Sequence, residues 1–198
     1  MMLQKTLAQE AAAVSKLLKK SGHQLVLAES CTGGMIASSL VANPGISENL
    51  CGSFVVYQVK SKKKWLGLNP KQLKRDSVES WQTAREMAKA ALRQTPFATI
   101  AASTTGFLTS KNADDDGRIC FSVAIRKGKK IEVRETVEVH LKTLQRDKNH
   151  APHKLVASLL KISSNSPPLP LRLKRQMLAS WVSLSMVRGL LRGKPTPH

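Results

Sequence analysis

A serine lies in a short polar and glycine-rich segment between an apolar run and a helical pattern. Residues 24–28 are apolar and have the length of a buried strand, and the letters ESCTGG follow at residues 29–34. Backbone N–H groups at such a strand-to-helix turn can receive an anion or a developing oxyanion. The hydroxyl of Ser30 would then be placed to attack a carbonyl group. The amides that would receive the negative charge lie near Thr32, Gly33 and Gly34.

The same turn also has a purely structural interpretation. Ser30 or Thr32 would cap a helix that runs to about Ala42, where the letters NPG end it. Spacing alone leaves both interpretations open.

A nucleophilic serine needs a base, and lysines follow the next apolar run, residues 53–59. A lysine serves as a base only when burial or neighbouring positive charge lowers its pKa, and the run from Lys60 to Lys64 supplies like charges. Tyr57, the only tyrosine of the chain, lies near the end of the apolar run. The structural alternatives are a solvated, basic helix start for the lysines and a core position for the tyrosine ring.

Hydrophobic periodicity places these residues in an α/β protein. Apolar side chains recur at helical spacing in residues 3–18, 80–94 and 154–162. Strand signals cover residues 24–28, 53–59, 97–103, 118–125 and 131–139, the last two as a hairpin. Strands separated by helices, with a hairpin late in the chain, predict a mixed β-sheet flanked by helices on both faces.

The chain divides into one main domain and a basic extension. Residues 1–162 form the predicted α/β domain, residues 163–170 are a Pro- and Ser-rich linker, and residues 171–198 are a basic segment that can form a helix. The formal net charge is +19, and the main domain is basic even without the tail. Such a field attracts phosphates, nucleic acid and anionic membranes alike. Nucleic acid is thus a possible partner of the tail.

Cysteine and histidine spacing argues against a disulfide framework or a metal site. The three cysteines form no CxxC pair, and the two histidines of the letters HAPH at residues 150–153 lack further ligands beyond Asp147. No apolar run reaches the roughly 18 to 20 residues of a membrane span. We therefore expect a cytoplasmic protein without a bound metal.

Three segments together resemble the C-terminal domain of the competence/damage-inducible CinA proteins and their stand-alone relatives. They are AESCTGG at residues 28–34, FVVYQVKSK followed by WLG at residues 54–67, and TTG at residues 104–106. Family members share AESCTGG, a segment of the form FVTYSNEAKxxxLG and a TGxAGPxGG loop. The correspondence runs in order over about residues 3–162.

The resemblance implies deamidation of nicotinamide mononucleotide, in which the carboxamide is hydrolysed to a carboxylate and ammonia is released. By position it makes Ser30 the nucleophile, Lys62 its base, and Tyr57 a residue that assists proton transfer or orients the pair. Thr105 and Gly106 match the start of the third motif and would lie at the nucleotide pocket. The resemblance implies no cofactor, and it suggests a homodimer or larger assembly.

The chain departs from the family pattern where the nucleotide would bind. Residues 107–112 read FLTSKN in place of the glycine-rich AGPxGG, and bulky side chains there prevent close approach of the backbone to a ligand. The family segment GDRxxxR corresponds to residues 145–152, where Arg146 or Lys148 stands for the first arginine and Pro152 for the second. The cations that can hold a phosphate instead are Lys111, Arg118, Arg146 and Lys148.

These departures keep a rival hypothesis open. A relative could retain the fold, lose the reaction, and bind nucleic acid or a protein partner through its basic surface and tail. The complete AESCTGG and the lysine at the matching position favour the amidohydrolase.

Overall fold

A computed structural model describes residues 2–108 and 110–140 of the chain. The helices are α1 (Met2–Ser21), α2 (Met35–Val41), the 3-10 turn η1 (Ile46–Glu48), α3 (Val59–Leu66), α4 (Pro70–Asp76) and α5 (Trp81–Gln94). The strands are β1 (Leu25–Glu29), β2 (Leu50–Val55), β3 (Ile100–Gly106), β4 (Arg118–Lys127) and β5 (Lys130–His140). The predicted linker, the tail and the predicted helix at 154–162 lie outside the described residues.

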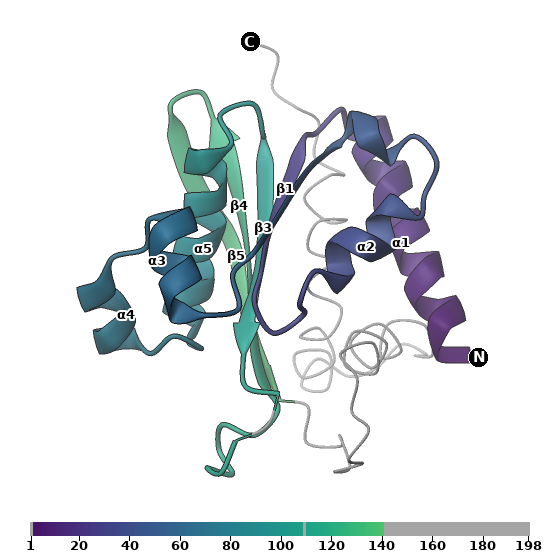
Figure 1. The fold of residues 1–198 in the computed structure, drawn as a ribbon. Coiled ribbons are helices and arrows are strands. Elements are labelled where there is room, and N and C mark those ends of the chain that lie inside the picture. Colours follow the sequence, from purple (N-terminus) through teal and green to yellow (C-terminus); the bar gives the residue numbers. More distant parts are fainter. Residues whose placement is uncertain (1, 109, 141–198) are drawn as a thin grey trace, which may run out of the picture.

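The five strands form one mixed sheet in the order β2-β1-β3-β4-β5. Strands β2, β1 and β3 are parallel, whereas β4 and β5 continue the sheet as an antiparallel hairpin. Helices α1 and α2 cover one face of the sheet, and α3, α4 and α5 cover the other (Figure 1). The predicted fold class, a mixed sheet with helices on both faces, is therefore confirmed.

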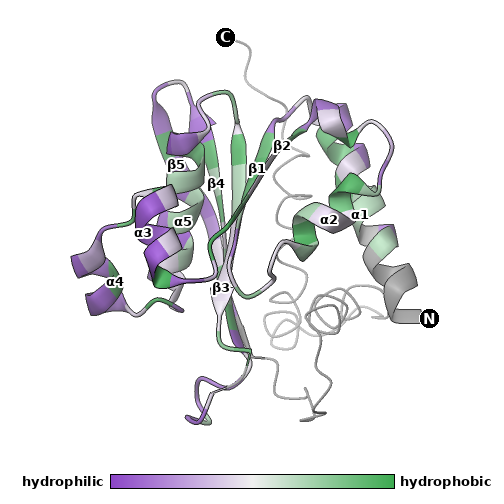
Figure 2. Cartoon of the chain, viewed as in Figure 1, coloured by the Kyte–Doolittle hydropathy of each residue, from purple (hydrophilic) through white to green (hydrophobic). Residues whose placement is uncertain are grey.

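Burial of both sheet faces explains why β1 reads as a continuous apolar run. Leu25 and Leu27 point into the core beneath α1 and α2, while Val26 and Ala28 point into the core beneath α5. All five residues of β1 are buried, so the strand shows no polar alternation. In Figure 2 helices α3 and α4 are mostly hydrophilic in colour, whereas α2 is largely hydrophobic or neutral.

Strand β1 also sets the ends of its two neighbours, β2 and β3, which corrects two predicted boundaries. Strand β2 ends at Val55, not at residue 59, because Val55 pairs with Glu29, the last residue of β1. Strand β3 begins at Ile100, not at residue 97, because Ile100 pairs with Leu25, the first residue of β1. The chain leaves the sheet where the pairing partner ends.

The other predicted elements agree with the structure within a few residues. The predicted helix over residues 80–94 is α5, and Ser80 accepts a hydrogen bond from the Thr83 N–H as its N-cap. The predicted hairpin is β4 and β5, which pair from Lys127 opposite Lys130. Among the described residues, no helix has both the length and the apolarity that a bilayer crossing demands.

Candidate active site

The candidate site lies where the carboxyl ends of the parallel strands meet. After β1 the chain enters α2 on one face of the sheet, whereas after β2 it enters α3 on the opposite face (Figure 1). Two adjacent parallel strands whose connections leave in opposite directions open a crevice at their carboxyl ends, which is where α/β sheets bind ligands. Ser30 follows β1 directly, and Lys62 belongs to α3.

Ser30 and Lys62, although 32 residues apart in the sequence, are in direct contact. Lys62 Nζ lies 2.8 Å from Ser30 Oγ, and both side chains are buried. The amine also donates to the carbonyl oxygens of Val56 at 3.0 Å and Tyr57 at 3.3 Å. In these contacts Lys62 donates to all three oxygen atoms. A neutral amine would keep two N–H groups for the carbonyls and could accept the Ser30 proton with its lone pair.

Burial is the main influence on the charge of Lys62. Desolvation lowers the pKa of Lys62 below its usual range, while the charge of Glu79, and that of Cys31 when its thiol is ionised, act in the opposite direction. Lys62 is only 1% exposed, so the structural alternative of a solvated lysine is wrong at this position. The neighbouring Lys60, Lys63 and Lys64 are exposed, as that alternative predicts. Helix α3 thus turns one of its four lysines inward.

Cys31 is adjacent to Ser30, but its thiol is unsuited to act as the nucleophile. The side chain is 3% exposed, and burial raises the pKa of the Cys31 thiol to about 12. The thiolate is the reactive form of cysteine, and this thiol stays protonated near neutral pH. The hydroxyl of Ser30, which contacts Lys62, is therefore the nucleophile that the geometry favours.

Tyr57 contributes its backbone to the site, whereas its ring points to solvent. The side chain is 68% exposed, so the alternative of a core position is wrong. Among the described residues, no hydrogen bond joins the Tyr57 hydroxyl to Ser30 or Lys62; the Tyr57 carbonyl oxygen is the atom that contacts Lys62. In this conformation Tyr57 orients the amine through its backbone.

A buried carboxylate, not a hydroxyl cap, organises the turn after Ser30. Helix α2 begins at Met35, Gly34 is its N-cap without a side-chain hydrogen bond, and the helix ends at Val41. The predicted cap by Ser30 or Thr32 is therefore wrong. Glu29 is fully buried and accepts five hydrogen bonds, from the N–H groups of Gly34, Ile36 and Ala37 and from the hydroxyls of Thr32 and Ser53.

These bonds also occupy amides that were expected to receive an oxyanion. The Gly34 N–H donates to Glu29 at 3.1 Å, and the Gly33 N–H donates to the Ser30 carbonyl at 3.1 Å. Thr32 is buried, and its hydroxyl contacts both Glu29 and Thr104. The structure places all three residues beside Ser30 but gives each a structural bond, so their role toward a substrate stays a prediction.

Strand β3 forms the opposite wall of the site. The Ser30 N–H donates to the Thr104 carbonyl at 3.0 Å, which ties the turn to this strand. The Thr105 hydroxyl donates to the Val78 carbonyl at 3.0 Å, just before α5. At Gly106 a Cβ atom would lie 2.3 Å from the Arg118 carbonyl oxygen, so close strand packing requires glycine there. The contact of Thr105 and Gly106 with a nucleotide stays a prediction.

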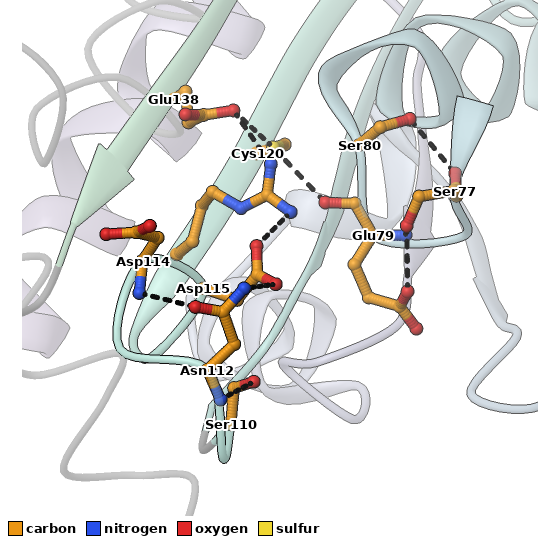
Figure 3. Close-up of polar contacts among 10 residues, drawn as sticks. Ser77, Glu79, Ser80, Ser110, Asn112, Asp114, Asp115, Cys120 and Glu138 are labelled. Carbon is orange, nitrogen blue, oxygen red and sulfur yellow. Dashed lines mark hydrogen bonds and ion pairs between the residues drawn. The ribbon is translucent and has the colours of Figure 1, made fainter.

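The loop after Gly106 contacts Arg118, whose guanidinium is paired with carboxylates. Arg118 lies 2.6 Å from the Asp115 carboxylate and 3.6 Å from Glu138, and its guanidinium lies over the Phe107 ring. Figure 3 shows Asp115 in this loop and Glu138 on β5, with Cys120 between Glu138 and the Glu79 backbone. Arg118 is thus paired with two carboxylates, whereas Lys111 is exposed. Any phosphate that approached Arg118 would have to compete with these carboxylates.

The remaining predicted phosphate ligands, Arg146 and Lys148, lie outside the described residues, as do Asp147 and the two histidines near it. Among residues 2–108 and 110–140, no group of three or more His, Cys, Asp or Glu side chains is arranged to hold a metal ion.

Two residues of the site, Glu29 and Thr104, were not among those predicted from the sequence. The signal for Glu29 was present, because an acidic residue that ends a wholly apolar strand must find hydrogen-bond donors if it is buried. Thr104 gave no comparable signal, since threonine is ordinary at a strand end.

Known proteins share both the sequence pattern and the fold. A model of the CinA C-terminal domain family matches residues 7–160. The CinA-like protein of Myxococcus xanthus is 43% identical over 97 residues, which cover 49% of this chain and 23% of that protein. The CinA-like protein of Chloroherpeton thalassium is 38% identical over 114 residues, which cover 56% and 27%. The chain thus matches only about a quarter of the length of these curated relatives.

Solved structures of other proteins have a fold similar to that of this chain. The competence/damage inducible protein CihA from Agrobacterium tumefaciens superposes with a TM-score of 0.67 at 22% identity, covering 93% of this chain and 95% of that one. The competence damage-inducible protein A from Klebsiella pneumoniae superposes with a TM-score of 0.69 at 20% identity, covering 95% and 99%. At these identities the likeness shows the fold alone.

Proposed function

Because the chain belongs to the CinA C-terminal domain family, which includes amidohydrolases of nicotinamide mononucleotide, we propose that it deamidates this nucleotide. The observation that carries the proposal is the distance of 2.8 Å between Lys62 Nζ and Ser30 Oγ, with both side chains buried at the carboxyl ends of β1 and β2. A hydroxyl held against an amine of lowered pKa is the arrangement that nucleophilic catalysis requires.

In the proposed reaction Ser30 Oγ attacks the carboxamide carbon while neutral Lys62 takes the hydroxyl proton. Lys62 then gives that proton to the amide nitrogen, the carbon–nitrogen bond breaks, and ammonia leaves with a serine ester in place. Lys62 next takes a proton from water, whose oxygen attacks the ester. The proton returns to Ser30, and nicotinate mononucleotide departs. Lys62 acts as base and acid in turn and ends in its starting state.

Ammonia release from nicotinamide mononucleotide by the purified full-length protein tests the proposal. We expect Ser30→Ala to lower the rate by at least about 10³-fold, because the nucleophile is removed. Ser38→Ala is the matched control, since Ser38 is exposed on α2 and also loses only a hydroxyl. Wild-type turnover no faster than that of Ser30→Ala would contradict the proposal.

The pH dependence of the same reaction reports on Lys62. The base must be neutral, and burial lowers the pKa of Lys62 below its usual range. As the pH falls through this lowered pKa, Lys62 becomes protonated and kcat/KM falls. We therefore expect an acid limb whose midpoint lies below the ordinary lysine pKa. A limb at or above that value would argue against Lys62 as the base.

The loop at residues 107–112 favours a second candidate function. It lacks the glycines of the family loop, and the nearby Arg118 is paired with Asp115 and Glu138. A relative that has lost the reaction, and binds nucleic acid or a protein instead, would show no ammonia release from either wild type or Ser30→Ala.

A further inference from the structure

Helices α3 and α4 present a strongly basic surface beside the candidate site. Both helices cover the same face of the sheet and appear hydrophilic on their outer sides in Figure 2. Their exposed side chains include six cations, which we call the basic face together with the exposed Trp65. The six are Lys60, Lys63 and Lys64 of α3, and Lys71, Lys74 and Arg75 of α4.

The spacing of these cations repeats from one helix to the next. On each helix they occupy positions i, i+3 and i+4, which lie on one side of an α-helix. The opposite side is buried, through Lys62 and Leu66 on α3 and through Leu73 on α4. Both triplets therefore point away from the core.

The stability of the helices does not account for this pattern. Cations in the last turn of a helix interact favourably with its dipole, which suits Lys63, Lys64, Lys74 and Arg75. Lys60 and Lys71, however, lie in the first turns of their helices, where the same dipole disfavours positive charge, and neither first turn holds an acidic residue. Like charges at i and i+4 are also mutually destabilising.

Some basic residues elsewhere in the described chain pair with carboxylates, although Lys16, Lys19 and Lys20 of α1 do not. Glu86 pairs with two cations of α5, and Glu132 pairs with two cations of the hairpin. On the basic face only Arg75 has a carboxylate partner, Asp76, among the described residues. Five cations of this face can therefore pair with an external anion.

From this surface we infer that α3 and α4 bind single-stranded nucleic acid. Unpaired cations on one face supply phosphate contacts and make binding strongly dependent on salt. Trp65, which follows Lys64 and lies about 100° around the helix from it, is 55% exposed, and an exposed indole provides a platform on which an unpaired base can stack. The stacking platform is the reason to expect a single strand, because the bases of a duplex are already stacked on one another.

The test is the binding of a fluorescent oligothymidylate to the full-length protein at several salt concentrations. Replacing the α3 triplet, or the α4 triplet, by glutamine should weaken binding. The slope of log K against log salt should then become shallower by about 0.7 for each phosphate that the variant no longer neutralises. Trp65→Ala should weaken single-strand binding by roughly 5- to 150-fold with little change in that slope. Its effect on a duplex of equal length should be much smaller.

A matched control comes from the other side of the sheet. Lys16, Lys19 and Lys20 of α1 are exposed at the same helical spacing, so their replacement by glutamine removes the same charge. Equal losses of affinity from this control and from the α3 and α4 triplets would overturn the inference, because they would indicate attraction by net charge alone. Unchanged affinity of Trp65→Ala, or binding only to vesicles of anionic phospholipid, would also overturn it. None of these outcomes depends on ammonia release.

Discussion

Replacing Lys62 by methionine is expected to lower kcat for ammonia release by about 10²–10⁴-fold, the range that a general base contributes. Methionine has nearly the length of the lysine side chain but cannot take a proton. Without the amine that lies against Ser30 Oγ, the hydroxyl would have to attack with no base beside it. The expected fall appears in kcat, because the proton transfer belongs to the transition state and not to substrate binding.

The same substitution has two opposing effects on the free energy of unfolding: it removes an ionisable group that is costly to bury, and it takes away the donor of the Val56 and Tyr57 carbonyl oxygens. Burial lowers the pKa of Lys62, so below that pKa folding must carry the cost of burying an ammonium group. This penalty is largest at acid pH. It begins to fall as the pH rises through the lowered pKa of Lys62 in the folded protein, and it disappears above the ordinary pKa that Lys62 has in the unfolded chain. An apolar side chain removes this penalty but does not replace the lost hydrogen bonds, so in urea unfolding the stability of Lys62→Met relative to wild type should be most favourable at low pH and should fall as the pH rises.

Lys129→Met is the control for both measurements, because Lys129 is exposed in the turn of the hairpin. We expect it to change neither kcat nor stability measurably. If Lys62→Met lost activity only in proportion to lost stability, the buried lysine would be a structural residue and the proposed mechanism would be wrong.

The fold could be predicted from periodicity because the sheet is covered on both sides. Burial of both faces made β1 wholly apolar, and the one-sided burial of α5 produced a clear helical stripe. Boundaries were less predictable, since they depend on pairing. Val56 is as apolar as Val55, and only the end of β1 at Glu29 determines that β2 stops between them.

The Ser30–Lys62 pair of the candidate site was predictable from the sequence, but its geometry was not. Ser30 and Lys62 were identified from their types and from a resemblance, but four lysines stand within five positions of α3. Helical rotation buries Lys62 with Leu66, its neighbour at i+4, and leaves the other three lysines in water. Tyr57 is an aromatic residue in an apolar run, which suggested a core position. Its ring is exposed instead, because β2 ends before it at Val55.

Glu29→Gln is expected to lower the free energy of unfolding by about 2 kcal/mol or more. One carboxylate oxygen accepts three hydrogen bonds and the other accepts two. Glutamine replaces one of these oxygens with an NH₂ group, which cannot accept, so two or three donors lose their partner whichever way the amide turns. Each buried donor left without an acceptor costs about 1–3 kcal/mol.

Chemical denaturation measures this loss, with Glu86→Gln on α5 as the matched control. Glu86 is only partly buried and pairs with Lys89 and Arg93, so the same substitution there should cost no more than about 1 kcal/mol. A loss of similar size for the two variants would mean that Glu29 does not hold the turn. Because the Glu29 bonds fix the backbone directly after Ser30, we also expect Glu29→Gln to lower kcat even at temperatures where the variant is fully folded. A variant that is destabilised but keeps full kcat would show that Ser30 is positioned by Thr104 and Lys62 alone.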